Sequence, residues 1–317
     1  MHDLRSLLEV IRDIERLIAK LVEGRGNARD LRSLGQSLSM FPGIRELISG
    51  SSPRLLKKRA EEIHEMPDLV STIDAAIDEE PSALLKEGGI IRGGYSVELD
   101  ELREVASKGK QWLAEFQARE QERTGIKNLK VRHNKVFGYY IEVSKGQIGN
   151  VPSDYVRKQT LVNAERYITP ELKEYEDRVM GAHEKSKELE YDLFLEVRKA
   201  AVDETFRIQE SAGAIATLDV LASLADRAVA QGYVRPGIDD STVIEIEGGR
   251  HPVVEQMLEG ESFVSNDALL DTGKNQLIII TGPNMAGKST YIRQVALMVI
   301  MAQAGSFVPA ASARIGV

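Results

Sequence analysis

Apolar residues recur three or four positions apart through the first part of the chain. From Leu4 to Leu21 this spacing predicts one amphipathic helix that is closed by Gly24. Asn27 is placed to cap a second helix, Ser52-Pro53 opens a third, and a fourth runs from Leu69 to Ile77. The pattern therefore predicts a helical bundle whose leucines form the core.

Two longer helical stretches follow the bundle. One runs from about Val97 to Arg123, with Trp112 in its apolar stripe as a packing residue. The other covers residues 171–232, which lie between two prolines and keep a helical period. A single straight helix of that length would measure ~93 Å. We therefore expect one or more breaks, with Gly181 and Gly213 as candidates.

The segment between these helices has a different period. Leu129–Arg132 alternates between apolar and polar residues, His133-Asn134-Lys135 can turn, and Tyr139, Ile141 and Val143 alternate back. Alternation on both sides of a short turn is typical of a β-hairpin. The order of elements predicts a long helix running out to a small β-domain at its tip, and long helices returning.

From residue 233 the pattern becomes that of an α/β domain. Thr242–Ile246 is expected to be a strand, and His251-Pro252 leads into a short helix. Leu277–Ile280 is a short apolar run that predicts a strand covered on both faces. Phe263 lies in a loop and, by pattern alone, is a core residue. A further helix is expected from residues at helical spacing, namely Ile292, Val295, Ala296, Val299 and Ile300.

Composition narrows the class of protein. The chain has 317 residues and a formal net charge of −8. It contains no cysteine, which excludes disulfides and thiolate metal sites. The N-terminus lacks a signal-peptide pattern, and the longest apolar run, Val295–Ala302, is too short to span a bilayer. We expect a cytoplasmic protein. His183 is expected to be a solvated helix residue, and no structural metal is predicted.

Positive charge is concentrated in one segment. Residues 124–170 contain eight Lys or Arg against three acids, which leaves the rest of the chain at −13. Such a segment suits contacts with DNA phosphates, and it equally suits a solvated β-domain with a tyrosine core. Both interpretations stay open at this point. The candidate phosphate contacts are Lys130, Arg132, Lys135, Lys145, Arg157 and Lys158.

Gly282–Ser289 fits the pattern G-x-x-x-x-G-K-[ST], which is that of the phosphate-binding loop of nucleoside triphosphatases. Its two glycines allow the backbone amides to turn onto phosphate oxygens, Lys288 supplies a positive charge, and the Ser289 hydroxyl can complete a Mg²⁺ shell. ATP or ADP with Mg²⁺ is therefore the expected ligand. The candidate nucleotide-binding residues are Gly282, Pro283, Asn284, Met285, Ala286, Gly287, Lys288, Ser289 and Thr290.

The loop is not followed by an acidic residue. After Asp271 the sequence contains no Asp or Glu, whereas hydrolysis at such a site requires a carboxylate on the Mg²⁺ shell. We expect a truncated α/β domain that binds nucleotide and does not hydrolyse it alone. No catalytic residue is assigned.

Three stretches resemble the MutS family of DNA mismatch repair proteins. They are Thr281–Thr290 with the Tyr-Ile-Arg-Gln-Val-Ala-Leu that follows, Leu129–Val143, and Arg157–Glu176 with its Asn-Ala-Glu-Arg-Tyr and Thr-Pro-Glu-Leu-Lys-Glu-Tyr-Glu. The resemblance extends through essentially the whole chain, and these motifs are far more specific than the loop alone.

The resemblance implies a multidomain, mainly α fold. Residues 1–123 and 171–232 would form the helical core and lever, residues 124–170 a basic β-rich clamp inserted at the lever tip, and residues 233–317 the N-terminal half of a P-loop (ABC-type) ATPase domain. Phe263 would stack on adenine instead of joining the core. The intact protein would be a dimeric, DNA-dependent ATPase that loads on mismatched duplex DNA and recruits a MutL-type factor. Its mismatch-reading region and later ATPase motifs would lie outside this sequence.

Alternatives are weighed against the order of elements. A MutS2-type paralogue is not expected to carry a comparable clamp, which the hairpin argues against. Coiled-coil chromosome-maintenance ATPases place the phosphate loop before the arms, and a small-molecule kinase does not need arms. A structural DNA-binding module with an inert nucleotide loop stays open for this chain.

Overall fold

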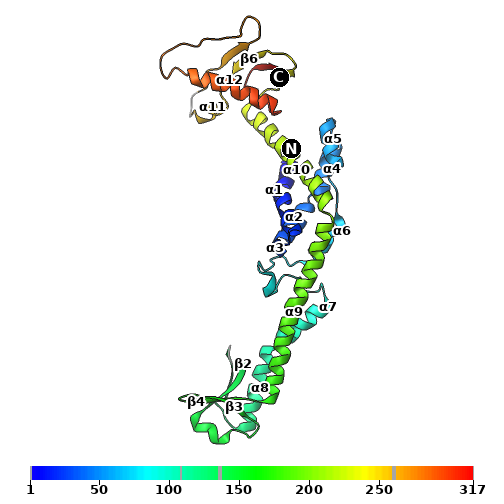
Figure 1. Cartoon of the computed structure of the whole chain (residues 1–317), viewed down its shortest axis with the longest axis vertical. Helices are drawn as coiled ribbons and strands as arrows, with labels where there is room; N and C mark the ends of the chain where they lie inside the picture. Colours follow the sequence, from blue (N-terminus) through cyan, green and yellow to red (C-terminus); the bar gives the residue numbers. More distant parts are fainter. Residues whose placement is uncertain (1, 108, 135–137, 259–261, 317) are drawn as a thin grey trace. The chain divides into compact units, whose positions relative to one another are not determined.

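The computed structural model (Figure 1) describes residues 2–107, 109–134, 138–258 and 262–316. Their contacts divide the chain into two compact units. The hairpin unit comprises Val10–Pro42 and His64–Glu210, and the loop unit comprises Met1–Glu9, Gly43–Ile63 and Ser211–Val317. Among the described residues, no helix combines the length and apolar character needed to cross a membrane.

The hairpin unit is built mainly of helices. They are α2 (Ile14–Val22), α3 (Ala28–Leu38), α6 (Pro67–Ala76), α7 (Val97–Ser107), α8 (Gly109–Thr124) and α9 (Pro170–Asp203), with 3-10 helices η1 (Leu85–Glu87) and η2 (Lys145–Asn150). The predicted cap is confirmed, because the Asn27 side chain accepts from the Asp30 N–H and Asp30 accepts from Asn27 in return. The predicted Val97–Arg123 helix corresponds to α7 and α8.

Helix α9 is the element against which the rest of the hairpin unit packs. It contacts α2, α6, α7 and β2, and it runs beside α7 and α8 in Figure 1. Thr169 caps its first turn by accepting from the Leu172 N–H at 3.2 Å. Glu190, buried on its inner face, accepts from the Ile90 N–H at 2.8 Å and pairs with Arg103 at 2.9 Å. This carboxylate ties a loop and a neighbouring helix to α9.

The long return stretch breaks once, at a position that the sequence pattern does not indicate. Helix α9 ends at Asp203 and α10 (Thr205–Gln231) begins two residues later, with Glu204 between them at φ −93° and ψ 9°. The Thr205 hydroxyl donates to the Val202 carbonyl at 2.5 Å. Gly181 and Gly213 both lie within helices, so the expectation of a break at either was wrong.

The first predicted helix is also two helices. Helix α1 (His2–Val10) ends because the Arg12 N–H donates to the Ser37 hydroxyl at 3.0 Å, and Asp13 then caps α2 by accepting from the Arg16 N–H. The prediction of one continuous helix from Leu4 to Leu21 was therefore wrong. Helix α5 (Arg54–Glu61) begins directly after Pro53, where the sequence predicts that a helix opens, whereas α4 (Phe41–Ser49) was not predicted.

The predicted hairpin is confirmed and is half of a four-stranded antiparallel sheet. Strands β1 (Lys130–Asn134), β2 (Gly138–Ser144), β3 (Val156–Thr160) and β4 (Ala164–Ile168) pair in the order β1-β2-β4-β3. One face packs on α8 in a core that contains Phe116, Ile126, Leu129, Ile141, Val143, Tyr155, Tyr167 and Leu172. Trp112 packs against this core, as expected, and stacks on Tyr175 with ring centroids 3.6 Å apart.

The loop unit contains a smaller mixed sheet. Strands β5 (Gly237–Asp239), β6 (Ile244–Gly249), β7 (Asn266–Leu270) and β8 (Ser312–Gly316) pair in the order β5-β8-β6-β7, with β5 parallel to β8. Helix α11 (Val254–Met257) follows β6, and α12 (Lys288–Gln303) packs on that strand through Met298 and Ala302.

Leu277–Ile280 does not form the predicted strand. These residues have no ladder partner in the described part of the chain, and Leu277 is 81% exposed. The helix predicted from Ile292 to Ile300 is confirmed as part of α12, and its Ile292 and Ile300 are exposed as well. Together they line an apolar groove of about 630 Å³. The four strands pair among themselves, which leaves this apolar run outside the sheet.

Gly138 begins β2 at φ +71°, and a Cβ there would overlap the carboxylate of buried Glu176 on α9. We expect Gly138→Ala to lower the free energy of unfolding by ~1–3 kcal/mol, because it adds an unfavourable φ and a steric clash. Urea unfolding followed by circular dichroism measures the change. Gly146→Ala is the matched control, since no atom lies within 4 Å of its Cβ position; equal stability of the two variants would contradict the expectation.

Candidate functional site

The glycine-containing loop leads directly into α12. Gly282 has φ +153° and Gly287, the N-cap of α12, has φ +80°, so both use conformations that glycine permits. Met285 between them has φ +68° and a fully exposed side chain. Both glycines of the loop therefore adopt backbone conformations that a residue with a Cβ rarely takes, and the N-terminus of α12 lies at the end of the loop.

Lys288 is folded onto its own loop. Its ammonium group donates to the carbonyl oxygens of Gly282 and Pro283 at 2.7 and 2.6 Å. These carbonyls are neutral acceptors, whereas a triphosphate oxygen is charged and forms a stronger hydrogen bond with an ammonium group. The lysine is thus placed within the loop and can exchange these partners for an anion.

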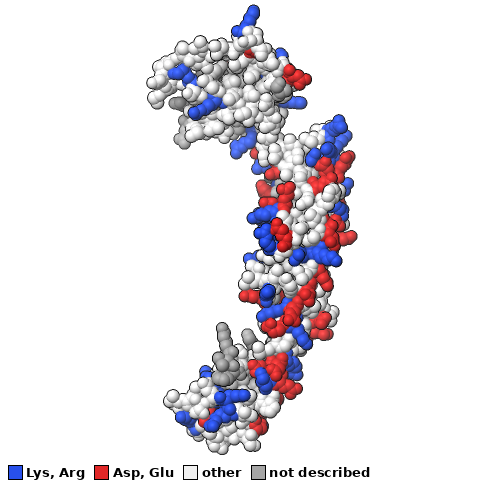
Figure 2. All heavy atoms as spheres, viewed as in Figure 1, with Lys and Arg blue, Asp and Glu red and all other residues white. Residues whose placement is uncertain are grey.

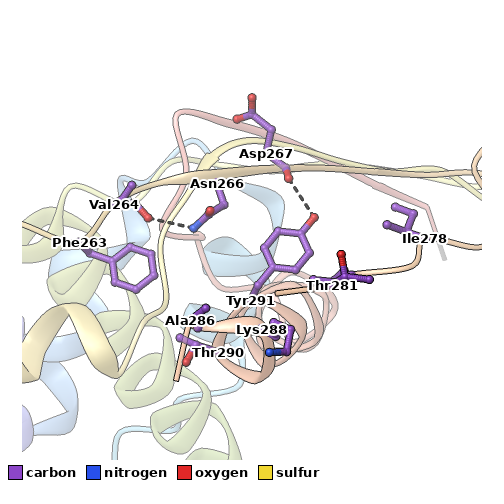
Figure 3. Close-up of a pocket in the computed structure, with 12 residues that line it drawn as sticks. Phe263, Val264, Asn266, Asp267, Ile278, Thr281, Ala286, Lys288, Thr290 and Tyr291 are labelled. Carbon is purple, nitrogen blue, oxygen red and sulfur yellow. Dashed lines mark hydrogen bonds between the residues drawn. The ribbon is translucent and has the colours of Figure 1, made fainter. Parts of the chain in front are cut away.

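Phe263 lies on the same cavity as the loop, although they are far apart in the sequence (Figure 3). The cavity has a volume of about 630 Å³ and is lined by Phe263, Val264, Asn266, Asp267, Ile278, Ile280, Thr281, Ala286, Gly287, Lys288, Thr290 and Tyr291. Phe263 is half-buried and does not belong to the core around α12. An aromatic ring and an ammonium group on one cavity suit a ligand with a planar base and a phosphate chain.

The sequence identified only part of this cavity. Five predicted residues line it: Phe263, Ala286, Gly287, Lys288 and Thr290. The other predicted loop residues lie at its edge, exposed and without lining it: Gly282, Pro283, Asn284, Met285 and Ser289. Tyr291 and Asn266 were missed. No local sequence pattern indicates them, because they meet at the cavity through the position of α12 beside β7. The Tyr291 hydroxyl donates to the Asp267 carbonyl at 3.0 Å and so joins the two elements.

Asp267 is the one carboxylate among the described residues that line the cavity. Its Oδ1 accepts from the Gly248 N–H at 2.7 Å, and in Figure 3 the carboxylate points away from the lysine. It is therefore engaged with the β6 backbone and is not arranged to coordinate a cation held at Ser289.

The second candidate site is the outward face of the four-stranded sheet. Lys130 and Arg132 alternate with Val131 on β1, so they share the face opposite the core. Both are exposed. Figure 2 shows Lys and Arg atoms at the surface over this sheet in that view, and both signs of charge along the helices of the hairpin unit.

Three of the remaining predicted cations do not join this face. Arg157 lies opposite Tyr167 and pairs with the buried Glu165 at 3.4 Å. Lys158 is exposed at an irregularity in β3, and Lys145 is exposed at the start of η2. Lys135 lies outside the described residues. The structure thus brings together two of the six candidates and separates three others from them.

Arg166 is the cation that sequence reasoning missed on this face. It lies opposite Glu142 in the β2–β4 ladder, and its guanidinium group is 4.4 Å from the centroid of the Tyr140 ring. The signal was present in the alternation of β4, where Glu165 and Tyr167 face the core and Arg166 faces away. Charge counting alone does not reveal it.

Two buried tyrosine–carboxylate pairs lie at the sheet, one joining it to α8 and the other within β4. The Tyr155 hydroxyl donates to Glu120 at 2.8 Å, and the Tyr167 hydroxyl donates to Glu165 at 2.5 Å. Burial raises the pKa of Tyr167 to about 12, and the hydrogen bond to Glu165 adds to the shift. Burial likewise raises the pKa of Tyr155. These tyrosines are structural, so the aromatic residues of this segment are largely core.

Two family profiles match the chain. MutS family domain IV matches residues 94–185, which include the four-stranded sheet and its flanking helices. MutS domain V matches residues 278–317, which include the glycine-containing loop and α12.

Curated relatives match nearly the whole chain. It is 52% identical over 314 residues to the DNA mismatch repair protein MutS of Symbiobacterium thermophilum, 50% over 315 to that of Alkaliphilus oremlandii, and 51% over 315 to that of Acetivibrio thermocellus. Each alignment covers 99% of this chain and 36% of the relative. The chain therefore spans about a third of the length of these relatives, and the predicted resemblance to the MutS family is confirmed.

The position of Lys288 generates a direct test. We expect Lys288→Ala to raise the Kd for Mg·ATP about tenfold or more, because the variant loses a charge-assisted hydrogen bond to phosphate. Isothermal titration calorimetry measures the constant. Lys274→Ala is the control, because Lys274 is exposed and does not line the cavity, so this substitution removes the same charge at another place. An unchanged Kd in the Lys288 variant would refute the assignment.

Proposed function

Because nearly the whole chain is similar to MutS proteins, we propose that it is a segment of an ATP-dependent DNA mismatch repair protein. In this proposal the four-stranded sheet grips the backbone of duplex DNA, and the loop at Gly282–Ser289 binds ATP. Helices α9 and α10 correspond to the lever that couples nucleotide state to the clamp. The observation that carries the proposal is that the chain is about half identical in sequence to these relatives over 99% of its length.

DNA binding is supported by the sheet. Its outward face carries Lys130, Arg132 and Arg166, and its other face packs on a hydrophobic core. A protein with a net charge of −8 repels nucleic acid on average, so contact with phosphates requires a local positive face of this kind. Contacts to phosphates alone do not read sequence, which fits a clamp.

ATP binding is supported by the shared cavity. Phe263 would stack on the adenine, Lys288 would contact the β- and γ-phosphates, and the Ser289 hydroxyl would join the Mg²⁺ shell. The ion would supply charge neutralisation at the phosphates. The remaining parts of the proposal come from the resemblance: a dimer on mismatched duplex, recruitment of a MutL-type factor, and a cytoplasmic location.

The phosphate-contact role of the sheet predicts a salt-sensitive interaction. We expect Lys130→Glu to weaken binding to a short duplex about three- to tenfold near 0.1 M salt, and to lower the salt slope by about one. Fluorescence anisotropy over a salt series measures both quantities. Lys185→Glu, on the exposed surface of α9, carries the same charge change away from the sheet and should leave them unaltered. Binding that is equal at low and high salt would remove the proposal.

The chain is further expected to bind ATP without turning it over. The sequence has no carboxylate after Asp271, and the Asp267 carboxylate is engaged with the Gly248 N–H. A hydrolytic site needs a carboxylate on the metal shell. Phosphate release by the purified chain should match that of its Lys288→Ala variant. Faster release that is lost in the variant would show that the chain is a complete catalyst.

A further inference from the structure

Four polar residues form a row across the outward face of the sheet. The strand registers place Lys130 opposite Glu142, Glu142 opposite Arg166, and Arg166 opposite Gln159. Neighbouring strands lie about 4.8 Å apart, so Lys130 and Arg166 flank Glu142 at roughly 10 Å from each other. The row thus presents a carboxylate between two cations, on the face proposed to contact DNA.

Arg166 is held in place by its neighbours. Its guanidinium group lies over the ring of buried Tyr140, and its Nη1 donates to the Gln159 side chain at 2.8 Å. The side chain is 20% exposed. A planar guanidinium group that is stacked and hydrogen-bonded loses little freedom when a phosphate approaches. Arg166 is therefore a preformed cation at the centre of the face.

Glu142 contacts two guanidinium groups weakly. Its Oε1 lies 3.6 Å from Nε of Arg132, and its Oε2 lies 3.5 Å from Nε of Arg166. Both distances exceed those of a charge-assisted hydrogen bond, and the buried Arg166 Nε has no hydrogen-bond partner among the described residues. The carboxylate therefore neutralises the two arginines without satisfying them. An anion with better geometry can take its place.

We propose that Glu142 is an internal counter-ion that competes with DNA phosphates for Arg132 and Arg166. The inference rests on the proposed DNA-gripping function and adds a residue that limits its strength. Glu142 lowers the affinity of the face for duplex DNA, and Arg166 is the contact that it chiefly masks. Because each phosphate contact multiplies the residence time on DNA, such a limit shortens that time.

The proposal predicts that removing the charge of Glu142 alters both the affinity for duplex DNA and its dependence on salt. Glu142→Gln should tighten binding to a short duplex about three- to tenfold near 0.1 M salt, and should steepen the salt slope by about one, the value for one added phosphate contact. Glu174→Gln is the matched control. It removes one negative charge from an exposed site on α9 that has no ion pair among the described residues, and it should alter neither quantity.

A second pair of variants assigns the effect to the arginines. If Glu142 acts through them, Glu142→Gln should give no gain in a chain that already carries Arg132→Gln and Arg166→Gln. A residue whose role is only to support the sheet would instead lower thermal stability and weaken binding in both backgrounds. If Glu142→Gln does not fold, Glu142→Thr removes the same charge with a residue that favours strands.

The outcomes separate this inference from the proposed function. Binding by a folded Glu142 variant that is equal to or weaker than that of the original chain overturns the counter-ion role. If Lys130→Glu still weakens binding in the same assay, the DNA-gripping face stands without it. If neither substitution affects binding, the face does not contact DNA and both proposals are wrong.

Discussion

The burial of one face of the four-stranded sheet is the constraint on which the candidate DNA surface depends. Ile141 and Val143 of β2 and Tyr167 of β4 pack on α8 and fix the register of these two strands. Because side chains alternate along a strand, this packing decides which cations face outward. A slip of one residue would bury Arg166 and expose Tyr167. The charge of the outward face is therefore a consequence of hydrophobic packing on the inward face.

Sequence patterns succeeded wherever a local rule determined the structure. The cap at Asn27, the hairpin at Leu129–Val143 and the packing role of Trp112 all follow from periodicity and neighbouring residues. The break between α1 and α2 did not, because it depends on a contact between distant residues. Arg12 leaves the first helix to meet Ser37, twenty-five residues away, and no local signal marks that contact.

The loop unit shows the same limit at its apolar residues. A β-branched run such as Leu277–Ile280 becomes a strand only when a neighbour offers its backbone groups, and here the described strands pair with one another instead. Periodicity reports that a segment is apolar, whereas its partner is a property of the whole sheet. In the same way, the loop motif located Lys288 but did not reveal Tyr291 or Asn266, which reach the cavity through the position of α12 relative to β7.

The two candidate anion sites differ in what an incoming phosphate must replace. At the loop, Lys288 is held by two neutral carbonyls, and a charged oxygen is the stronger partner, so exchange favours the nucleotide. On the sheet, Arg132 and Arg166 face a carboxylate, whose charge is comparable to that of a phosphate diester. Exchange there is nearly balanced, and the release of counter-ions from DNA decides its direction. The partner that an incoming phosphate must displace therefore distinguishes the two candidate sites. The loop is suited to retaining its ligand, and the sheet face is suited to reversible contact.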